Sequence, residues 1–482
     1  MIPMTLGKIA AAMGATSDAR AEAIDRWLQL PILRVTTDSR DIQPGDLFFA
    51  IRGARLDGHR FLAEAASKGA VAGVVDNPSF EPQCDPAFPL LVVDNTISAL
   101  GRLATYFRRE VLPPGTIVIA MTGSNGKTTT KCMIDHVLRP TLEGRASPKS
   151  FNNQIGVPLT LLSGGQDDRY LIVEIGSNAP GEVASLAKMA SPNAAVITSI
   201  GQAHLEGLHN IDEIVREKVS LLDHVRGGGM AVVNFDCPEI QTRLQPPPDV
   251  RLVTIGFSPR SERRVVLLES SMTGIVFVLD GRDRIALPLP GAHHAVNAAA
   301  AFLIARWLGL GAGEIIERLA TFTPPPGRAR ILDAGEVKVI DDTYNANPTS
   351  MAEAVRTLSL AASQRRVFVM GDMLELGAQS PSFHRDAVHE VVSRGIEVLV
   401  AVGPACTEAA RSIADQTNGH TRVLTCKTAD AAGDLLDTVL QPGDTVWIKG
   451  SRALQLDRVV DHVMNRKSPV ASAQAPVRHS PA

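Results

Sequence analysis

The fold is decided by the stretch Met121-Thr122-Gly123-Ser124-Asn125-Gly126-Lys127-Thr128-Thr129-Thr130-Lys131. It follows the apolar, β-branched run 116–120 and leads into residues 132–138, which predicts a strand, a glycine loop and a helix in that order. Glycines let backbone N–H groups surround a phosphate, and the helix adds the positive end of its dipole. We therefore expect Lys127 to reach the β- and γ-phosphates of a nucleotide and the Thr128 hydroxyl to ligate Mg²⁺.

The loop departs from the strict P-loop pattern at one position. That pattern has glycine where this chain has Met121, so the loop is a shortened T-G-S-N-G-K-T variant. The alternative interpretation is a glycine-rich turn that happens to contain a lysine. The ordered succession of strand, loop, lysine, hydroxyl and helix favours phosphate binding over that alternative.

Length and composition indicate an ordinary globular protein with several domains. A chain of 482 residues suggests about three domains. The net charge of −3 gives no argument for nucleic acid as a partner. The five cysteines form no Cys-x-x-Cys pair, which favours a reducing cytoplasm over a disulfide or zinc framework.

Targeting and membrane segments are not expected. The chain opens without the basic, apolar and small-residue succession of a signal peptide, and no apolar run approaches the roughly 18 residues that a membrane span needs. Residues 467–482 are rich in Pro, Ser and Ala, and we expect them to form a disordered tail.

Residues 1–112 predict a small α/β domain. Apolar runs at 47–51, 72–75 and 89–93 alternate with a helical stretch at 61–66. Asp38-Ser39-Arg40 lies in a polar turn of this domain. An arginine and a serine beside a glycine-bearing loop are suited to hold a diphosphate, although composition alone favours ordinary turn chemistry and surface charge.

Residues 113–322 predict a second domain with a parallel sheet, which begins after the hinge 113–115. The apolar runs 170–173 and 194–200 are followed by Glu174 and His204. Ligands of such sheets lie beyond the carboxyl ends of the strands, so we expect both side chains to converge on the glycine loop. There Glu174 is a candidate to complete the Mg²⁺ shell, and His204 a second one.

Two further residues of this domain attract notice. Lys218 lies on the apolar stripe of the helical stretch 211–222; an inward-facing lysine has a depressed pKa and can act as a nucleophile, even toward CO₂. The alternative is a lysine whose ammonium reaches the rim of the protein. Asn297 lies in the first turns of the helix predicted at 293–308, where it either binds a ligand or caps the helix.

Residues 323–466 predict a third domain, a doubly wound sheet after the hinge 324–327. Its layout is Rossmann-like but lacks G-x-G-x-x-G, so we do not expect a dinucleotide. A dense polar loop at 341–348 follows a predicted strand. Arg328, just after the hinge, is placed to stabilise the charge that develops in phosphoryl transfer.

The ordered set of motifs resembles the Mur ligases over residues 1 to about 462. The resemblance implies a three-domain α/β architecture, with a small N-terminal domain, a central P-loop ATPase-like domain and a C-terminal Rossmann-like domain. The motifs are Asp38-Ser39-Arg40, Asp57-Gly58-His59, T-G-S-N-G-K-T at 122–128, F-N-N-Q-I-G-V-P at 151–158, E-I-G-S-N at 174–178, A-H-L-E at 203–206, Asn297, Gly327-Arg328, D-D-T-Y-N-A-N-P at 341–348, G-D-M-L-E-L-G at 371–377 and K-G-S-R at 449–452.

The loop D-D-T-Y-N-A-N-P looks like that of the family members that add D-Ala-D-Ala. The resemblance then implies a cytoplasmic, monomeric ligase with ATP and Mg²⁺. ATP would phosphorylate the terminal carboxylate of a UDP-N-acetylmuramoyl tripeptide, the amine of D-Ala-D-Ala would attack the acyl phosphate, and the intermediate would collapse to amide, ADP and phosphate. The product would be a peptidoglycan precursor.

The resemblance also implies residue roles. Lys127, Lys218, Arg328 and His204 would be catalytic, and Thr128, Glu174, His204 and Lys218 would serve the magnesium ions, with Lys218 carbamylated as in several relatives. The nucleotide would contact Thr122, Gly123, Ser124, Asn125, Gly126, Lys127, Thr128, Thr129, Asn297, Arg328 and Asp342. The other substrates would contact Asp38, Ser39, Arg40, Asn152, Asn153, Tyr344, Asn345 and Asn347.

Two alternatives stay open at this point. One is another Mur-type ligase that adds a single amino acid, although the D-N-P-R motif expected of the tripeptide-forming relative does not occur. The other is a P-loop NTPase or kinase without an amine acceptor, which leaves residues 1–112 unexplained. We also expect the hinges near 113 and 324 to let Arg328 and Lys449 approach the glycine loop when ligands bind.

Overall fold

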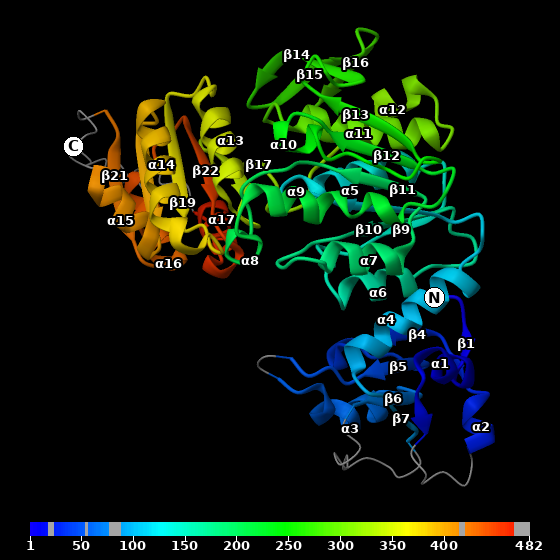
Figure 1. Ribbon diagram of the computed structural model, residues 1–482. Coiled ribbons are helices and arrows are strands. Elements are labelled where there is room, and N and C mark those ends of the chain that lie inside the picture. The colour runs from blue at the N-terminus through cyan, green and yellow to red at the C-terminus, as the bar shows by residue number, and fades with distance from the viewer. Residues whose placement is uncertain (18–23, 54–55, 77–87, 414–419, 467–482) are drawn as a thin grey trace, which may run out of the picture. The chain divides into compact units, whose positions relative to one another are not determined.

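The computed structural model describes residues 1–17, 24–53, 56–76, 88–413 and 420–466 (Figure 1). They form two compact units. The first contains Met1–Ile200, Asn210–Val265 and Val296–Arg318, and the second contains Gly201–His209, Val266–Ala295 and the chain from Leu319 onward. The domain limits predicted near 112 and 322 stay predictions, and the tail predicted at 467–482 lies outside the described residues.

The N-terminal part of the first unit is a small sheet with helices. Its elements are β1 (Met4–Thr5), α1 (Leu6–Met13), β2 (Thr16–Ser17), α2 (Ile24–Leu28), β3 (Pro31–Ile32), β4 (Arg34–Thr36), η1 (Ser39–Asp41), β5 (Asp46–Phe49), η2 (Gly58–Phe61), α3 (Leu62–Ser67), β6 (Ala72–Val75), β7 (Leu90–Val92) and α4 (Thr96–Tyr106). The strand order is β2-β7-β6-β5-β4, parallel except for β2. Every residue of β5 and β6 is buried, which explains their largely apolar sequence.

The rest of the first unit is built around the predicted parallel sheet. Its elements are β8 (Ile117–Thr122), α5 (Lys127–Leu138), β9 (Gly144–Ala146), α6 (Gly156–Leu162), β10 (Tyr170–Glu174), α7 (Glu182–Ala190), β11 (Ala194–Ile197), α9 (Ile211–Val219), η4 (Leu222–His224), β12 (Met230–Asn234), α10 (Pro238–Gln241), β13 (Arg251–Gly256), α11 (His294–Trp307) and α12 (Ala312–Leu319). The order β13-β12-β11-β8-β10-β9 is parallel throughout. Because these strands are parallel, the carboxyl ends of β8, β10 and β11 lie at the same edge of the sheet, where α5 begins.

One buried arginine joins these two parts of the first unit. Helix α4 continues into the π-helix η3 (Phe107–Val111), which carries Arg108. The Arg108 guanidinium donates to the carbonyl oxygens of Ala190 and Ser191, both at 3.0 Å, and to Asn193 Oδ1 at 2.8 Å. Burial lowers the pKa of Arg108 to about 10. The end of α4 is therefore fastened to the turn between α7 and β11.

The second unit contains the predicted doubly wound sheet. Its elements are α8 (Leu205–Leu208), β15 (Gly274–Leu279), β16 (Asp283–Leu287), β17 (Arg330–Asp333), β18 (Lys338–Asp342), α13 (Pro348–Ser359), β19 (Arg365–Gly371), η5 (Gly377–Gln379), α14 (Ser380–Ser393), β20 (Val398–Val402), α15 (Pro404–Ile413), β21 (Arg422–Cys426), α16 (Ala429–Val439), β22 (Asp444–Lys449), η7 (Arg452–Leu454) and α17 (Asp457–Met464). The order is β17-β18-β22-β19-β20-β21, with β17 antiparallel and the others parallel.

Some strands were not expected from the sequence. The antiparallel edge strand β17 extends the predicted sheet, and β15 and β16 form an antiparallel hairpin after β14 (Arg263–Ser271). The predicted α/β class with parallel sheets is confirmed.

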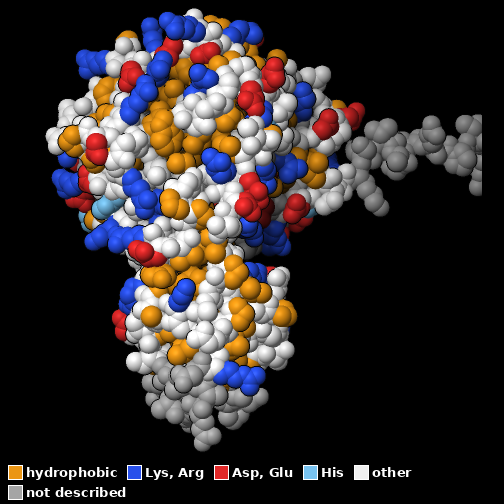
Figure 2. All heavy atoms as spheres, turned by 90° about the vertical axis from the view of Figure 1, so that its right-hand side faces the viewer, with side chains coloured by type: hydrophobic (Ala, Val, Ile, Leu, Met, Phe, Trp, Pro, Cys, Tyr) orange, Lys and Arg blue, Asp and Glu red, His pale blue; other side chains and the backbone are white. Residues whose placement is uncertain are grey.

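The surface mixes charges of both signs. On the face shown in Figure 2, Lys and Arg side chains are interspersed with Asp and Glu, and with apolar and uncharged groups. Within the described ranges, no helix combines the length and the apolar character that crossing a membrane requires.

Candidate active site

The glycine loop lies between β8 and α5, as predicted. Gly123 and Gly126 have φ values of 145° and 83°, which favour glycine. The end of β11 braces the loop: Ser199 accepts from Ser124 N through its carbonyl and from Asn125 N through its hydroxyl, both at 2.8 Å. The Thr198 hydroxyl donates to the Asn125 carbonyl at 2.5 Å. Strand β11 therefore holds the loop in shape.

Lys127 and Asn297 lie against the two glycines. Lys127 Nζ donates to the Gly123 carbonyl at 2.6 Å. A Cβ at Gly126 would lie 2.7 Å from Asn297 Oδ1, so the asparagine is directly beside the loop. Asn297 is the fourth residue of α11 and is buried, which excludes the capping alternative at that position. The glycines are thus required by conformation and by space.

Glu174 closes the arrangement at the start of α5. It is the last residue of β10 and 1 % exposed. The Thr128 hydroxyl donates to Glu174 Oε2 at 2.9 Å, and Asn152 Nδ2 donates to Oε1 at 3.1 Å. Mg²⁺ takes hard oxygen ligands such as a hydroxyl and a carboxylate, so the Thr128–Glu174 pair fits the predicted ion. Asn153 instead accepts from Ile155 N and Gly156 N at the start of α6.

Lys218 faces the interior of the first unit. It is 1 % exposed, so its ammonium does not reach the rim. Lys218 Nζ donates to Ser177 Oγ at 2.5 Å. Burial, with a further contribution from the like charge of Lys127, lowers the pKa of Lys218 to about 7. A large fraction of this amine is therefore neutral and nucleophilic near physiological pH.

His204 belongs to the second unit. It has φ 56° and precedes α8, and its Nδ1 lies 2.5 Å from Glu375 Oε2. The His204 ring holds the pKa of the Glu375 carboxyl below its usual value through this hydrogen bond. The predicted convergence of His204 and Glu174 on the glycine loop stays a prediction.

The polar loop after β18 is organised around two carboxylates. Asp341 accepts from Gly327 N at 2.8 Å and from the Thr343 hydroxyl at 2.7 Å. Asp342 forms an ion pair with Lys449 Nζ at 2.8 Å. These contacts tie the hinge glycine and the end of β22 to the loop.

Aromatic and amide groups complete this loop. The Arg328 guanidinium carbon lies 3.9 Å from the centroid of the Tyr344 ring, a cation–π contact. Asn345 is exposed, and its carbonyl accepts from Lys449 Nζ at 2.9 Å. Asn347 caps α13 by accepting from Ser350 N at 2.9 Å. The structure thus brings Arg328, Tyr344 and Asp342 into one loop region of the second unit.

The Asp38–Arg40 turn follows β4 of the small sheet in the first unit. Asp38 accepts from Arg40 N at 3.0 Å and from its guanidinium at 2.8 and 2.6 Å. The guanidinium lowers the pKa of the Asp38 carboxyl to about 2. Ser39 is buried and its hydroxyl lies 3.4 Å from Glu64 Oε2.

Sequence reasoning missed several residues around the glycine loop. Ser199 braces the loop, Ser177 accepts from Lys218, and Ser150 Oγ lies 3.1 Å from Thr128 Oγ1. Buried Lys131 lies 3.5 Å from Glu174 Oε2. Ser177 falls within a quoted motif at a strand end, which was a usable signal, whereas Ser150 and Lys131 contact partners distant in sequence.

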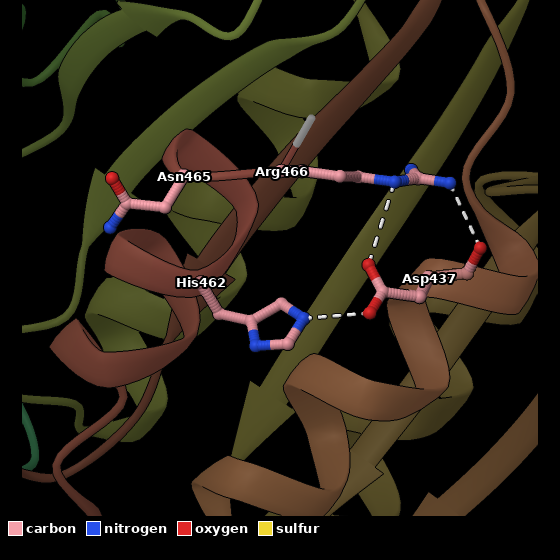
Figure 3. Close-up of a pocket in the computed structure, with 4 residues that line it drawn as sticks. All are labelled: Asp437, His462, Asn465 and Arg466. Carbon is pink, nitrogen blue, oxygen red and sulfur yellow. Dashed lines mark hydrogen bonds and ion pairs between the residues drawn. The ribbon is translucent and has the colours of Figure 1, made fainter. Parts of the chain in front are cut away.

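Two other clusters of the second unit do not contain predicted site residues. An open pocket between α16 and α17 is lined by Asp437, His462, Asn465 and Arg466; the Asp437 carboxylate pairs with His462 and Arg466 (Figure 3).

The second cluster comprises Asp372, His384 and Cys406, whose potential ligand atoms lie within 4.8 Å of one another. The Asp372 carboxylate accepts from Cys406 N, and His384 Nε2 accepts from Met373 N, so both groups are used by the backbone.

Family models match the chain in three places. They are the Mur ligase family, catalytic domain, at residues 31–108, the Mur ligase middle domain at 121–305, and the Mur ligase, glutamate ligase domain, at 327–452. The chain is 34 % identical over 433 residues to the UDP-N-acetylmuramoyl-tripeptide–D-alanyl-D-alanine ligase of Escherichia coli (strain K12), covering 88 % of this chain and 92 % of that protein. The enzyme of the same name from Bacillus subtilis (strain 168) is 30 % identical over 442 residues, or 90 % and 94 %.

Solved structures are similar along nearly the whole chain. A crystal structure of MurF from Acinetobacter baumannii has a TM-score of 0.83 at 29 % identity, covering 96 % of this chain and 99 % of that one. MurF ligase from Thermotoga maritima in complex with ADP has a TM-score of 0.76 at 25 % identity, covering 89 % and 97 %. The similarity therefore extends to the architecture as well as to the motifs.

Proposed function

The chain belongs to the Mur ligase family, and on this premise we propose that it joins D-alanyl-D-alanine to the terminal carboxylate of a UDP-N-acetylmuramoyl tripeptide at the expense of ATP. The observation that carries the proposal is the buried Thr128–Glu174 contact beside the glycine loop, an arrangement suited to a nucleotide phosphate and its cation. The choice of acceptor is supported by relatives that align over about nine-tenths of the chain.

The first step activates a carboxylate, which is a poor electrophile. A carboxylate oxygen of the tripeptide attacks the γ-phosphorus, the bond from that phosphorus to the ADP oxygen breaks, and an acyl phosphate and ADP form. The protein's contribution is positioning and stabilisation of charge. We assign the phosphates to Lys127 and the N–H groups of residues 122–129, and the γ-phosphate also to Arg328.

The second step forms the amide. The amine of D-Ala-D-Ala attacks the acyl carbon and loses a proton, and the tetrahedral intermediate expels phosphate. Asp38, Ser39 and Arg40 are assigned to the UDP end of the substrate, Asn297 to adenine and Asp342 to ribose. We assign the remaining substrate contacts to Asn152, Asn153, Tyr344, Asn345 and Asn347.

Thr128 and Glu174 would hold Mg²⁺, which when bound neutralises charge on the phosphate oxygens. His204 and Lys218 are assigned to the same role. An ammonium does not ligate a cation, so Lys218 requires a carbamate, which has a carboxylate-like end. Its burial and its pKa of about 7 support attack of the neutral amine on CO₂.

The test is phosphate release from ATP and Mg²⁺ with UDP-N-acetylmuramoyl tripeptide, with and without D-Ala-D-Ala. We expect release to require both organic substrates and mass spectrometry to identify the pentapeptide product. Release that responds to a single amino acid instead would indicate a sister ligase. Release that needs neither substrate would indicate a P-loop NTPase. Parallel assays with diaminopimelate and lysine tripeptides identify the third residue.

A further inference from the structure

Lys131 lies one helical turn beyond Lys127 in α5 and is 2 % exposed. An ammonium group has three N–H donors. Lys131 Nζ donates to the Ser147 carbonyl at 2.7 Å and to the Lys149 carbonyl, and it lies 3.5 Å from Glu174 Oε2. We propose that Lys131 is a positioning residue, which acts through Glu174 and the segment 147–152 to shape the magnesium site. This inference rests on the proposed function.

The first part of the argument concerns the carboxylate. Thr128 and Lys131 are three residues apart on α5, so they lie on one face of the helix. Both approach Glu174 Oε2, whereas Asn152 donates to Oε1. The two oxygens of the carboxylate are therefore contacted from different elements, Oε2 from α5 and Oε1 from the segment before α6. Removing Lys131 leaves a buried carboxylate without its nearby cation, and an uncompensated buried charge is costly.

The second part concerns the segment that carries Asn152. This segment leaves β9 at Ala146 and turns at Lys149, which has φ 47°. The carbonyls before and at this turn converge on the Lys131 ammonium. The chain then presents the Ser150 hydroxyl to Thr128 and the Asn152 amide to Glu174. Lys131 therefore contacts both Glu174 and the backbone of the segment that carries Ser150 and Asn152.

The test replaces Lys131 with glutamine and measures the affinity for Mn²⁺, which serves as a probe for Mg²⁺. Binding is followed by electron paramagnetic resonance in the presence of ADP. We expect the Kd of Mn²⁺ to rise about tenfold or more, because partners that orient metal ligands typically contribute that much. The affinity for ADP in EDTA should stay within about twofold, because Lys131 does not contact the loop glycines. Lys188→Gln, at an exposed position of α7, is the matched control.

Unchanged Mn²⁺ affinity in folded K131Q would overturn the inference. Lys131→Arg guards against loss of the fold, because it keeps the cation. Its planar guanidinium does not reproduce the geometry of the two hydrogen bonds and the ion pair of Lys131, so we expect weakened Mn²⁺ binding here too. A wild-type affinity of Lys131→Arg for Mn²⁺ would contradict the inference. These measurements do not use the ligase reaction. Lys131-dependent Mn²⁺ binding without tripeptide-dependent phosphate release would contradict the proposed function alone.

Discussion

The charges beside the glycine loop and the charges of the Asp38–Arg40 turn are organised in opposite ways. Glu174 is buried, and its contacts come from α5 and from the segment before α6. The Arg40 side chain is 86 % exposed, and its partner Asp38 is two residues away. Glu174 and Arg40 both lie in motifs that resemble those of the Mur ligases. The sequence alone therefore does not show that the first charge is buried and the second exposed.

The difference concerns what holds each geometry in place. Buried charges are poorly screened, and their positions follow from the packing of several elements. An exposed pair between near neighbours is weakened by salt and contributes little to stability. We therefore expect the glycine-loop region to be set before ligands arrive, and the Asp38–Arg40 turn to adapt to its ligand.

Lys127→Ala is expected to have the largest effect. Loss of the ammonium removes a charge that would stabilise the transferring phosphoryl group, and removal of one such group typically lowers kcat by about 10²–10³-fold. The measurement is tripeptide-dependent phosphate release, with Lys188→Ala as the control. Activity within about tenfold of wild type would show that the buried region is not organised for phosphoryl transfer.

Lys218 allows a further test of the buried region, because its reaction with CO₂ depends on pH. At constant dissolved CO₂, we expect the initial rate of ¹³CO₂ incorporation into Lys218 to rise with pH and to level off above about pH 8, since the neutral amine is the nucleophile and its pKa is lowered from 10.5 to about 7. Lys218→Gln should abolish the ¹³C NMR signal and lower phosphate release about 10–100-fold. An initial rate that keeps rising toward pH 10.5 would indicate a lysine with an ordinary pKa.

The same lowered pKa has a consequence for stability. Between about pH 7 and 10.5 the unfolded chain binds the Lys218 proton and the folded chain does not. The free energy of unfolding of the unmodified protein therefore gains a term that rises with pH across this window.

Tyr344→Ala should have an intermediate effect, on the KM for ATP. Tyr344→Ala removes the ring beneath Arg328, and a cation–π contact of this kind corresponds to about three- to tenfold in affinity. We expect the KM for ATP to rise by that factor, and Tyr344→Phe, which retains the ring, to restore it. A phenylalanine variant as impaired as alanine would assign the effect to the hydroxyl.

Arg40→Ala should have the smallest effect. We expect a KM for the UDP substrate about two- to fivefold higher at low salt, and a smaller difference at high salt. The midpoint of thermal unfolding should change by less than about 2 °C. A decrease of this midpoint by more than about 5 °C would mean that the Asp38–Arg40 turn contributes substantially to stability. That result would contradict the difference inferred between this turn and the buried region.

The sequence predicted the central strands and the place of Glu174 at the end of one of them. Buried parallel strands are continuous apolar runs, so β8, β10 and β11 stand out, and Glu174 follows from its place at the end of β10. Strand β14 was missed because most of its residues are at least partly exposed, which removes the apolar signal.

The partners of the site residues were not predictable. The carbonyls of Ser147 and Lys149 carry no side-chain signature, so nothing in the sequence links them to Lys131. The same holds for Ser199, whose hydroxyl and carbonyl brace the glycine loop only because β11 lies beside β8.

The buried Arg108 has a consequence for how the protein melts. Its bonds to Ala190, Ser191 and Asn193 cross from the end of α4 to the turn before β11, and side chains of α4 share one apolar core with α6 and α7. Unfolding of the small sheet alone would leave the Arg108 guanidinium and the carbonyls of Ala190 and Ser191 without these hydrogen bonds in an apolar interior. The N-terminal residues should therefore lose their structure cooperatively with the glycine-loop sheet, as a single calorimetric transition.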